Sequence, residues 1–445
     1  MMRLHFIGIA GALTAGVAKL AKEKGYEIAG SDRAFYPPFG EIARSLRVPL
    51  FTGYDATAKD RPADCYIIGN AVSRGNPLVE SVLSSRRPYI SAAQWLGENI
   101  LADKKVLAVA GTHGKTTTTI LLAWILHRAG LSPGFLAGGV APNFGASVCG
   151  GKSDLFVMEA DEYDSAFFDK RPKFLHYRPH IALLNNLEFD HADIYRNVGE
   201  IARQFHFLLR TVPANGRVVA RAGARHLRAA LDMGLYSPLS FFGGGVAEWR
   251  RRDGGGGRMH ILYRGKEMCN FTPPLIGAAN RDNILAAVAA AHYAGANARN
   301  AGEYLRDFRP PNRRLQKIAD ADGILVYDDF AHHPTAYRKT LEALAGEYPR
   351  KRIVAVFEPR SNTMKAGVMK RKLPRAFAAA HRIVAVGEQK WLADSLPPEK
   401  TRVLPDAAAA AEFLRKETRA DDCIVLMSNG DFGGLPQTVA KMATN

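Results

Sequence analysis

A run of seven residues combines two glycines with a lysine and three threonines. An apolar stretch precedes it and an amphipathic stretch follows it, which is the strand–turn–helix context in which Gly-Lys-Thr binds phosphate. Gly111 and Gly114 lack Cβ atoms, so backbone N–H groups can close around phosphate oxygens. Lys115 can reach the β- and γ-phosphates of a nucleotide, and the Thr116 hydroxyl can bind Mg²⁺. The sequence therefore predicts a nucleotide-binding loop made of Gly111, Thr112, His113, Gly114, Lys115, Thr116 and Thr117.

Four carboxylates follow a second apolar stretch, at 155–158. They fall within six residues and would repel one another unless a cation lies among them. Glu159 comes directly after the stretch, and we expect it to bind Mg²⁺ because hard cations take carboxylate oxygens. His191 follows another apolar stretch, and strand ends gather at one edge of a parallel sheet, so His191 could join Lys115 and Glu159 there. The alternative interpretation is a solvated acidic loop at Glu159, Asp161, Glu162 and Asp164.

Glycines also follow the first apolar stretch, at 4–8. Gly8, Gly11 and Gly16 suit a strand-to-helix turn that approaches a pyrophosphate. Asp32 ends a second strand, where a carboxylate usually meets a ribose or a base. The glycine spacing is not that of a dinucleotide site, and tight packing of the turn explains the same glycines equally well. Both interpretations stay open at this point.

A polar run at 327–335 follows an apolar stretch in the last third of the chain. Its paired aspartates and paired histidines could indicate a metal site. Contact with a nucleotide is as compatible with the run, since Asp329 can bind a ribose. Arg313 and Arg314 lie just upstream and could neutralise phosphate.

Predicted strands alternate with predicted helices along the whole chain. This alternation indicates parallel sheets, with ligands at the carboxyl ends of the strands. A chain of 445 residues is too long for one core, and the proline-rich segment at 309–311 is typical of a linker. We therefore predict an α/β protein with three domains, at 1–103, 104–308 and 309–445.

The chain carries 60 Lys and Arg residues against 43 Asp and Glu residues, a formal charge of +17. Apart from Arg250, Arg251 and Arg252 the basic residues are scattered, with no basic stripe interleaved with aromatic side chains. We therefore expect anionic small molecules, and no nucleic acid, as partners. No apolar run approaches the roughly 18 residues of a membrane span, and no signal peptide is recognisable. We expect a cytoplasmic protein with no membrane partner.

The order of these segments resembles that of the Mur ligases, ATP-dependent enzymes that join amino acids or peptides to a UDP-muramyl acid. The resemblance covers the whole chain. It implies an N-terminal Rossmann-like UDP-binding domain, a central P-loop ATPase domain and a C-terminal Rossmann-like domain. The matching segments are 111–117, 159–162, 190–191, Asn280, Asn283, 313–314 and 328–335.

Two activities within this family are candidates for this chain. One adds L-alanine, and the other adds the whole murein tripeptide L-alanyl-γ-D-glutamyl-meso-diaminopimelate. Several contiguous segments resemble the tripeptide-adding members, which implies a ligase that joins the tripeptide to UDP-N-acetylmuramate in peptidoglycan recycling. The alternative is a UDP-N-acetylmuramate–L-alanine ligase. The segments that favour the tripeptide are 36–38, 70–77, 162–171, 185–191 and 358–365.

The resemblance also implies roles for individual residues, with ATP as co-substrate. The implied catalytic residues are Lys115, Glu159, His191 and Arg314, and the implied Mg²⁺ ligands are Thr116, Glu159 and His191. The ATP contacts are those of the phosphate loop together with Asn280, Asn283, Arg314, Asp329 and His332. The UDP-sugar contacts are Gly8, Gly11, Asp32, Asn70 and Ser73. The peptide contacts are Arg360, Asn362, Ser428 and Asn429.

The chain departs from the family at Thr14 and Ala15, where relatives usually show methionine and glycine, and at two further points. Ala279 stands where a histidine is common, and no lysine lies between His191 and Lys266, so the carbamylated lysine that some members use for a second Mg²⁺ is not expected. Two other protein classes are disfavoured. An NAD-dependent dehydrogenase would leave the phosphate loop unexplained. A nucleotide-binding regulator without catalysis is disfavoured because Lys115, Glu159 and His191 are intact.

Overall fold

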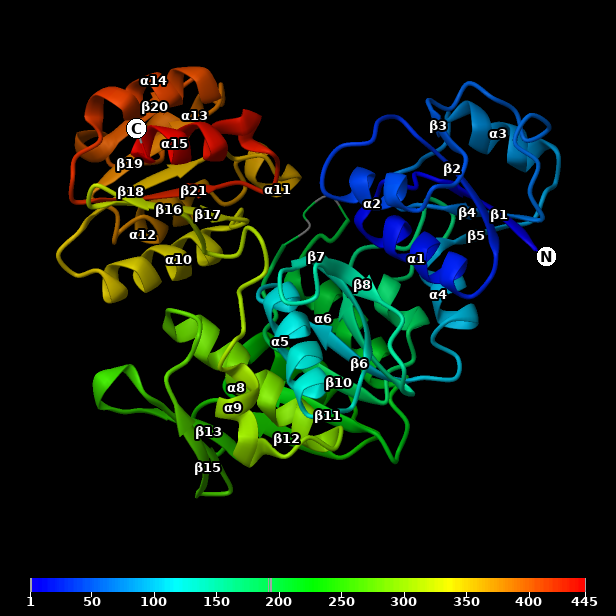
Figure 1. Cartoon of the computed structure of the whole chain (residues 1–445), viewed down its shortest axis with the longest axis horizontal. Helices are drawn as coiled ribbons and strands as arrows, with labels where there is room; N and C mark the ends of the chain where they lie inside the picture. The colour runs from blue at the N-terminus through cyan, green and yellow to red at the C-terminus, as the bar shows by residue number, and fades with distance from the viewer. Residues whose placement is uncertain (1, 191, 193, 445) are drawn as a thin grey trace. The chain divides into compact units, whose positions relative to one another are not determined.

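The computed structural model describes residues 2–190, 192 and 194–444. Strands and helices alternate along the chain, which confirms the predicted α/β class. The chain forms two compact units, and each is described by itself (Figure 1). The first unit comprises Met1–Phe189, Asn197–Thr272 and Asn283–Phe308, and the second comprises Asp190–Arg196, Pro273–Asp282 and Arg309–Asn445.

The first unit begins with a sheet of parallel strands. Their spatial order is β3 (Leu50–Thr52), β2 (Glu27–Asp32), β1 (Arg3–Ile7), β4 (Cys65–Ile68) and β5 (Tyr89–Ser91). The helices of this part are α1 (Ala12–Glu23), α2 (Phe39–Ser45), α3 (Pro77–Ser84) and α4 (Ala92–Asn99). Asn76 and Ser91 cap α3 and α4 by accepting hydrogen bonds from backbone N–H groups of the first turn, so polar side chains set where these helices begin.

The second sheet of the first unit is longer. Its spatial order is β15 (Lys266–Phe271), β14 (Met259–Tyr263), β13 (Trp249–Asp253), β12 (Leu239–Phe242), β11 (Arg217–Arg221), β10 (Ile181–Leu184), β6 (Lys105–Ala110), β9 (Leu155–Ala160), β7 (Gly134–Ala141) and β8 (Ala146–Cys149). The strands from β13 to β7 run parallel, and antiparallel pairs extend both edges. The buried apolar runs of β6, β9 and β10 form its centre.

Helices and short turns connect the strands of the second sheet. The helices are α5 (Lys115–Arg128), α6 (Val198–Leu209), α7 (Arg225–Asp232), α8 (Ala278–Tyr293) and α9 (Ala301–Leu305). The 3₁₀ turns are η1 (Lys173–His176), η2 (Gly255–Gly257) and η3 (Ala298–Asn300). Helix α8 extends from the second unit into the first, because the division between the units falls at Asn283.

Within the first unit, helix α1 packs against β7 and β8 of the second sheet. A Cβ on Gly16 would lie 2.9 Å from Cδ1 of Leu136, so the missing side chain permits this close approach. Nearby, Nζ of Lys19 donates a 3.2 Å hydrogen bond to the carbonyl oxygen of Val148. Of the two interpretations of the N-terminal glycines, Gly16 therefore fits packing.

The second unit contains a sheet in the order β16 (Gln316–Ala321), β17 (Ile324–Asp329), β21 (Asp422–Met427), β18 (Arg352–Phe357), β19 (Arg382–Val386) and β20 (Thr401–Leu404). Only the β16–β17 pair is antiparallel among these strands. The helices and 3₁₀ turns are α10 (Pro334–Glu347), α11 (Asn362–Lys365), η4 (Lys370–Lys372), α12 (Leu373–Ala376), α13 (Trp391–Asp394), η5 (Pro398–Lys400), α14 (Ala407–Glu417), η6 (Phe432–Gly434) and α15 (Leu435–Thr444). Every residue of β21 is buried, as a central parallel strand requires.

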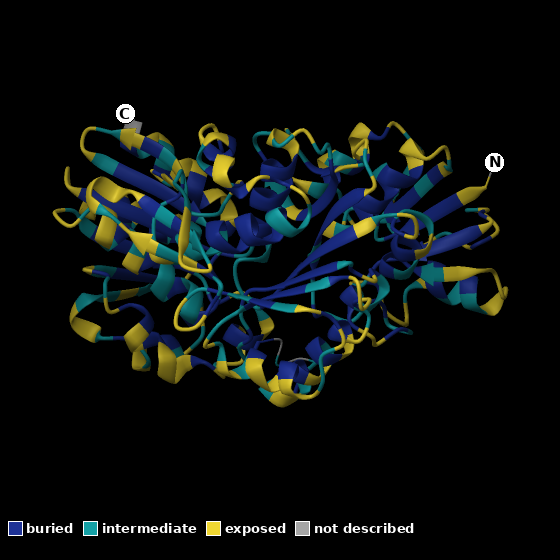
Figure 2. Ribbon diagram, turned by 90° about the horizontal axis from the view of Figure 1, so that it is seen from below, coloured by how far each residue is buried: buried dark blue, intermediate teal, exposed yellow. Residues whose placement is uncertain are grey.

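Burial follows the layers of the fold. Figure 2 shows the strands largely buried, whereas exposed residues gather on the helices and loops around them. Val326, Val354 and Ile424 on neighbouring strands of the second unit belong to one apolar cluster with Leu414 and Val439 of the covering helices. Across the described residues, no helix combines the length and the apolar character that a membrane span needs.

Candidate functional site

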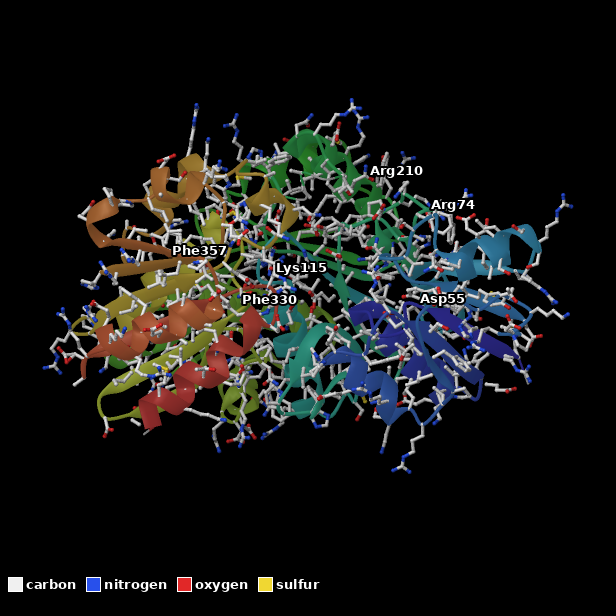
Figure 3. All side chains as sticks on the ribbon, turned by 90° about the horizontal axis from the view of Figure 1, so that it is seen from above. Asp55, Arg74, Lys115, Arg210, Phe330 and Phe357 are labelled. Carbon is white, nitrogen blue, oxygen red and sulfur yellow. The ribbon has the colours of Figure 1, made fainter. Side chains whose placement is uncertain are left out.

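The predicted phosphate loop joins β6 to α5 at the carboxyl end of a central strand. Gly114 precedes α5 with a φ of 82°, a left-handed conformation that favours glycine. A Cβ on Gly114 would lie 2.7 Å from Oδ1 of Asn283, so the Asn283 side chain lies directly against the loop. Helix α5 begins at Lys115, which is labelled in Figure 3. The structure therefore brings together three of the predicted nucleotide contacts.

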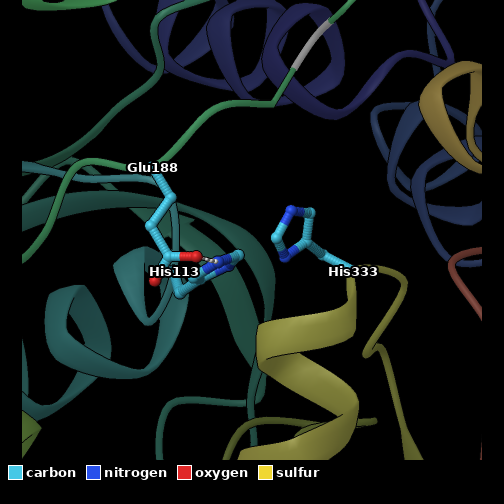
Figure 4. Close-up of side chains that lie close together, drawn as sticks. All are labelled: His113, Glu188 and His333. Atoms are coloured by element: carbon cyan, nitrogen blue, oxygen red, sulfur yellow. Dashed lines mark ion pairs between the residues drawn. The ribbon is translucent and has the colours of Figure 1, made fainter. Parts of the chain in front are cut away.

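The segment after β10 holds this loop in place. The backbone N–H of His113 donates a 2.8 Å hydrogen bond to the amide oxygen of Asn186, whose amide nitrogen donates one of 2.8 Å to the carbonyl oxygen of His113. The N–H of Glu188 donates to the Thr112 hydroxyl at 2.9 Å. Nε2 of His113 lies 3.5 Å from a carboxylate oxygen of Glu188 (Figure 4). The predicted site residue of this segment, His191, lies outside the described residues.

Sequence reasoning missed Asn186, the residue that binds both backbone groups of His113. Its position two residues after the buried strand β10 is a signal for it, because the residues just past strand ends lie at the ligand-binding edge of a parallel sheet. Thr117, a predicted nucleotide contact, is buried within the first turn of α5.

Glu159 lies within β9, which runs to Ala160, rather than just beyond the strand as expected. Its Oε1 accepts a 2.9 Å hydrogen bond from the hydroxyl of Thr116, and its Oε2 accepts one of 2.6 Å from the N–H of Gly138. Both donors, a hydroxyl and a backbone N–H, are uncharged groups. A carboxylate beside a threonine hydroxyl is an all-oxygen ligand set of the kind that Mg²⁺ prefers. These residues therefore fit the ion.

Two further carboxylates of the acidic cluster, those of Asp161 and Glu162, form ion pairs with lysines. Nζ of Lys115 lies 2.9 Å from Oε2 of Glu162 and 3.6 Å from Oδ1 of Asp161. Nζ of Lys173 lies 2.9 Å from Oδ2 of Asp161. Burial disfavours the charged ammonium of Lys115, but the carboxylates of Glu162 and Asp161 outweigh it, so the pKa of Lys115 lies above its ordinary value. The cation that the sequence required among these carboxylates is thus supplied in part by lysines.

The candidate UDP-sugar residues gather at the carboxyl ends of β1, β2 and β4. Gly8 has a φ of 84°, and a Cβ there would lie 2.9 Å from Cγ2 of Val72. The Asp32 carboxylate accepts a 2.8 Å hydrogen bond from the N–H of Ala10, in the turn after β1. Burial and the charge of Asp32 raise the pKa of Tyr54, which donates to this carboxylate, to about 12. Asp32 therefore organises the glycine turn itself.

Asn70 links this part to the acidic cluster. Its amide nitrogen donates to the backbone carbonyl and, at 2.8 Å, to the carboxylate of Asp164. Lys170 pairs with the other oxygen of Asp164 at 2.6 Å. Ser73 is exposed, and Gly11 is the residue that precedes α1. Asn70 thus fixes the loop after β9 on the first sheet.

In the second unit, Asp329 lies at the end of β17. One of its carboxylate oxygens accepts a 2.6 Å hydrogen bond from the N–H of Leu315, and the other accepts one of 2.8 Å from the N–H of Ala331. Burial raises the pKa of this carboxyl group, although the charge of Arg314 opposes the change. The guanidinium of Arg314 lies 4.6 Å from the centre of the Phe330 ring. Asp329 therefore shapes the turn that carries Arg314.

Two further predicted nucleotide contacts bond to nearby backbone. A ring nitrogen of His332 lies 2.9 Å from the carbonyl oxygen of Phe330, and the amide nitrogen of Asn280 donates a 2.9 Å hydrogen bond to the carbonyl oxygen of Ile276. The guanidinium of Arg313 donates a 2.7 Å hydrogen bond to the carbonyl oxygen of Ser428. Arg313 therefore ties the end of β21 to the turn before β16.

The candidate peptide contacts lie just past β18 and β21, two adjacent strands of the second unit. The Arg360 side chain is 48% exposed and donates a 3.2 Å hydrogen bond to Asp431. The hydroxyl of Ser428 accepts a 2.9 Å hydrogen bond from the N–H of the residue two positions on. The buried Oδ1 of Asn429 has no hydrogen-bond partner in the described part of the chain, and a ligand donor would satisfy it. Asn362, which begins α11, is exposed.

Comparison with known families covers nearly all of the chain. The Mur ligase family catalytic domain matches residues 3–104, the Mur ligase middle domain matches residues 109–291, and the Mur ligase glutamate ligase domain matches residues 313–430. These matches follow one another in the order of the three sheets.

Individual proteins are similar over nearly their full length. The UDP-N-acetylmuramate–L-alanyl-gamma-D-glutamyl-meso-2,6-diaminoheptandioate ligase of Escherichia coli (strain K12) is 42% identical, over 98% of this chain and 97% of that protein. A UDP-N-acetylmuramate–L-alanine ligase of Caldanaerobacter subterraneus is 30% identical, over 96% and 95%. The crystal structure of a murein peptide ligase from Psychrobacter arcticus is 34% identical with a TM-score of 0.77, covering 100% of this chain and 99% of its own. Since all three domain matches and these relatives agree, the chain belongs to the Mur ligase family.

Proposed function

We propose that this protein is an ATP-dependent ligase that joins L-alanyl-γ-D-glutamyl-meso-diaminopimelate to UDP-N-acetylmuramate in peptidoglycan recycling. One observation carries the proposal. The chain is 42% identical to a ligase named for that tripeptide and 30% identical to a ligase named for L-alanine, each over nearly the whole chain. The L-alanine-adding alternative is therefore the weaker one.

The chemistry begins with a carboxylate that does not react with an amine unless it is activated. In the proposed reaction the lactyl carboxylate of UDP-N-acetylmuramate attacks the γ-phosphorus of ATP, ADP leaves, and an acyl phosphate forms. The amine of the tripeptide then attacks the acyl carbon, loses a proton, and displaces phosphate as the amide forms. The first step is difficult because an anion approaches a polyanion.

Lys115 supplies a positive charge for that first step. It begins helix α5, whose N-terminal N–H groups and dipole also favour an anion. Its ammonium is buried against Glu162 at 2.9 Å, so phosphate oxygens would replace a carboxylate as its partner. A preorganised charge of this kind stabilises a transition state without reorganising at the moment of reaction.

We propose Mg²⁺ as the metal ion because two candidate oxygen ligands lie side by side. Thr116 and Glu159 would hold the ion, with their oxygens 2.9 Å apart across a hydrogen bond. Bound there, Mg²⁺ would offset negative charge on the transferred phosphoryl group. His191 is proposed as a further ligand from the sequence.

The experiment uses purified protein, ATP, Mg²⁺ and UDP-N-acetylmuramate, with either the tripeptide or L-alanine at equal concentration. Mass spectrometry should detect the tripeptide adduct, with stoichiometric ADP, as the faster-forming product. Faster formation of the L-alanine adduct would replace the proposal with its alternative, and no adduct with either amine would remove both.

We also propose domain boundaries at 103/104 and 308/309, which limited proteolysis would test. A cytoplasmic location and the roles given above for the candidate residues are proposed as well.

A further inference from the structure

Two lysines and two carboxylates alternate beside the phosphate loop. Lys173 contacts Asp161 at 2.9 Å, Asp161 lies 3.6 Å from Lys115, and Lys115 contacts Glu162 at 2.9 Å. All four belong to the first unit. The two lysine side chains are 13% exposed, the Asp161 side chain 27% and the Glu162 side chain 1%, so water screens these charges poorly.

Asp161 bridges the two ammonium groups with its two different oxygens. Oδ2 faces Lys173 at hydrogen-bond distance, whereas Oδ1 is farther from Lys115 than a normal hydrogen bond. Lys173 therefore has the stronger contact with the bridging carboxylate. Without that ammonium, Asp161 would still have its ion pair with Lys115, at 3.6 Å.

We propose that Lys173, acting through Asp161, is a positioning residue for the phosphate-loop lysine. Lys173 holds Asp161 away from Lys115. The Lys115 ammonium can then leave Glu162 and bind the phosphates of a nucleotide without first breaking a hydrogen bond to Asp161. This inference rests on the proposed function, because it takes the anion at this loop to be the triphosphate of ATP. It concerns two residues for which the family resemblance implied no role.

The physical reason is competition between anions for one cation. If Lys173 loses its charge, Asp161 can shorten its 3.6 Å ion pair with Lys115 to a hydrogen bond, and an incoming triphosphate must then break that bond as well as the contact with Glu162. One additional charge-assisted hydrogen bond to break should weaken nucleotide binding by about tenfold. Removing the charge of Asp161 as well should abolish that competition.

The test is a charge-compensating pair of substitutions. Lys173→Met should raise the dissociation constant of a non-hydrolysable ATP analogue about tenfold in calorimetric titration. It should raise the KM for ATP similarly and leave the KM for UDP-N-acetylmuramate unchanged. Adding Asp161→Asn to Lys173→Met should restore the affinity for the analogue. Lys173→Arg, which keeps the charge, should bind the analogue like the parent protein.

Lys170→Met is the matched control. Lys170 lies three residues before Lys173 and also pairs with an aspartate of the acidic cluster, Asp164 at 2.6 Å, but its side chain is 70% exposed. This variant should bind the analogue normally. If Lys173→Met does not purify as a folded protein, Lys173→Gln takes its place.

Two results would overturn the inference while leaving the ligase assignment intact. One is unchanged affinity for the analogue in a folded Lys173→Met protein. The other is weakened affinity that Asp161→Asn does not restore, which would make Lys173 a direct contact of the ligand. Parent protein that binds the analogue but forms no adduct would remove the proposed function. The affinities of the parent and the variants for the analogue could still be compared.

Discussion

The hydroxyl of Thr116, in α5, donates a 2.9 Å hydrogen bond to Oε1 of Glu159. Glu159 lies on β9, the strand that pairs with β6. Lys115, which precedes Thr116, contacts a different carboxylate, that of Glu162. The first two residues of α5 are thus matched to two carboxylates with different surroundings. The Glu159 carboxylate accepts hydrogen bonds from uncharged donors and suits a metal ion. The Glu162 carboxylate pairs with the Lys115 ammonium, where a phosphate group could replace it.

Substitution of Lys115 by alanine should abolish ligation while the protein stays folded. The ammonium is the charge at the start of α5 that would meet the transferring phosphoryl group. Its loss should lower the rate by at least about 10²-fold, as for removal of one preorganised donor in other enzymes. The measurement is ADP release with both substrates present, alongside circular dichroism. A folded variant with near-parental activity would show that Lys115 is not the catalytic cation.

Glu159→Gln should raise the Mg²⁺ concentration needed for half-maximal activity more than Asp161→Asn does. Glu159 has Thr116 beside it, whereas Asp161 is already paired with Lys173. The amide keeps the shape of the side chain and removes the charge that a hard cation prefers. A Mg²⁺ titration of initial rates compares the two variants. A larger shift for Asp161→Asn would show that Asp161, and not Glu159, binds the metal ion.

Arg360→Lys should raise the KM for the tripeptide about tenfold and leave the KM for ATP nearly unchanged. The tripeptide brings three carboxylates, and a planar guanidinium can bind one of them through two parallel hydrogen bonds. Lysine keeps the charge and loses that geometry. Initial rates at varied tripeptide test the prediction. Unaltered tripeptide dependence would move the peptide site elsewhere and leave the ligase assignment standing.

Gly430→Ala should change the tripeptide KM in the same direction. A Cβ on Gly430 would lie 2.3 Å from Nη1 and 2.4 Å from Cζ of Arg360, so the guanidinium would have to move. Gly346→Ala, in α10 of the same unit, is the matched control because a Cβ there meets open space. Equal tripeptide KM values for the two alanine variants would show that the position of the Arg360 guanidinium does not matter.

The stability of the first sheet should fall as the pH drops below neutral, because of His5. Burial, with a smaller effect of Arg61, lowers the pKa of this histidine from 6.5 to about 4. The unfolded chain therefore takes up a proton near pH 6.5 while the folded chain does not. The stabilisation is fully present above that value and is lost toward pH 4. Between about pH 7 and pH 5 the loss should be about 2 kcal/mol.

Native-state hydrogen exchange of the β1 amides at the two pH values measures this loss. His5→Gln should flatten the dependence, because glutamine does not titrate. His226→Gln, on α7, is the control and should keep the parental dependence. If His5→Gln loses as much stability between the two pH values as the parent protein does, other titrating groups cause the loss.

The sequence alone determined the parts of this protein that depend on local spacing. Gly114 and Lys115 sit at a strand-to-helix turn, and that turn is recognisable without knowing what lies beside it. The alternation of apolar and amphipathic stretches likewise predicted the α/β class, which is confirmed. The contiguous segments predicted the family, and family matches along the chain confirm it.

Only the tertiary structure decided which side chains meet the phosphate loop. Strand β6 lies between β10 and β9, so its loop is flanked by Asn186 on one side and Glu159 on the other. No local pattern states the order of strands in a sheet, and therefore none could pair Lys115 with Glu162 or Lys173 with Asp161. The physical reason is that these contacts join residues brought together by sheet topology, whereas spacing along the chain reports only on neighbours within one turn or one strand.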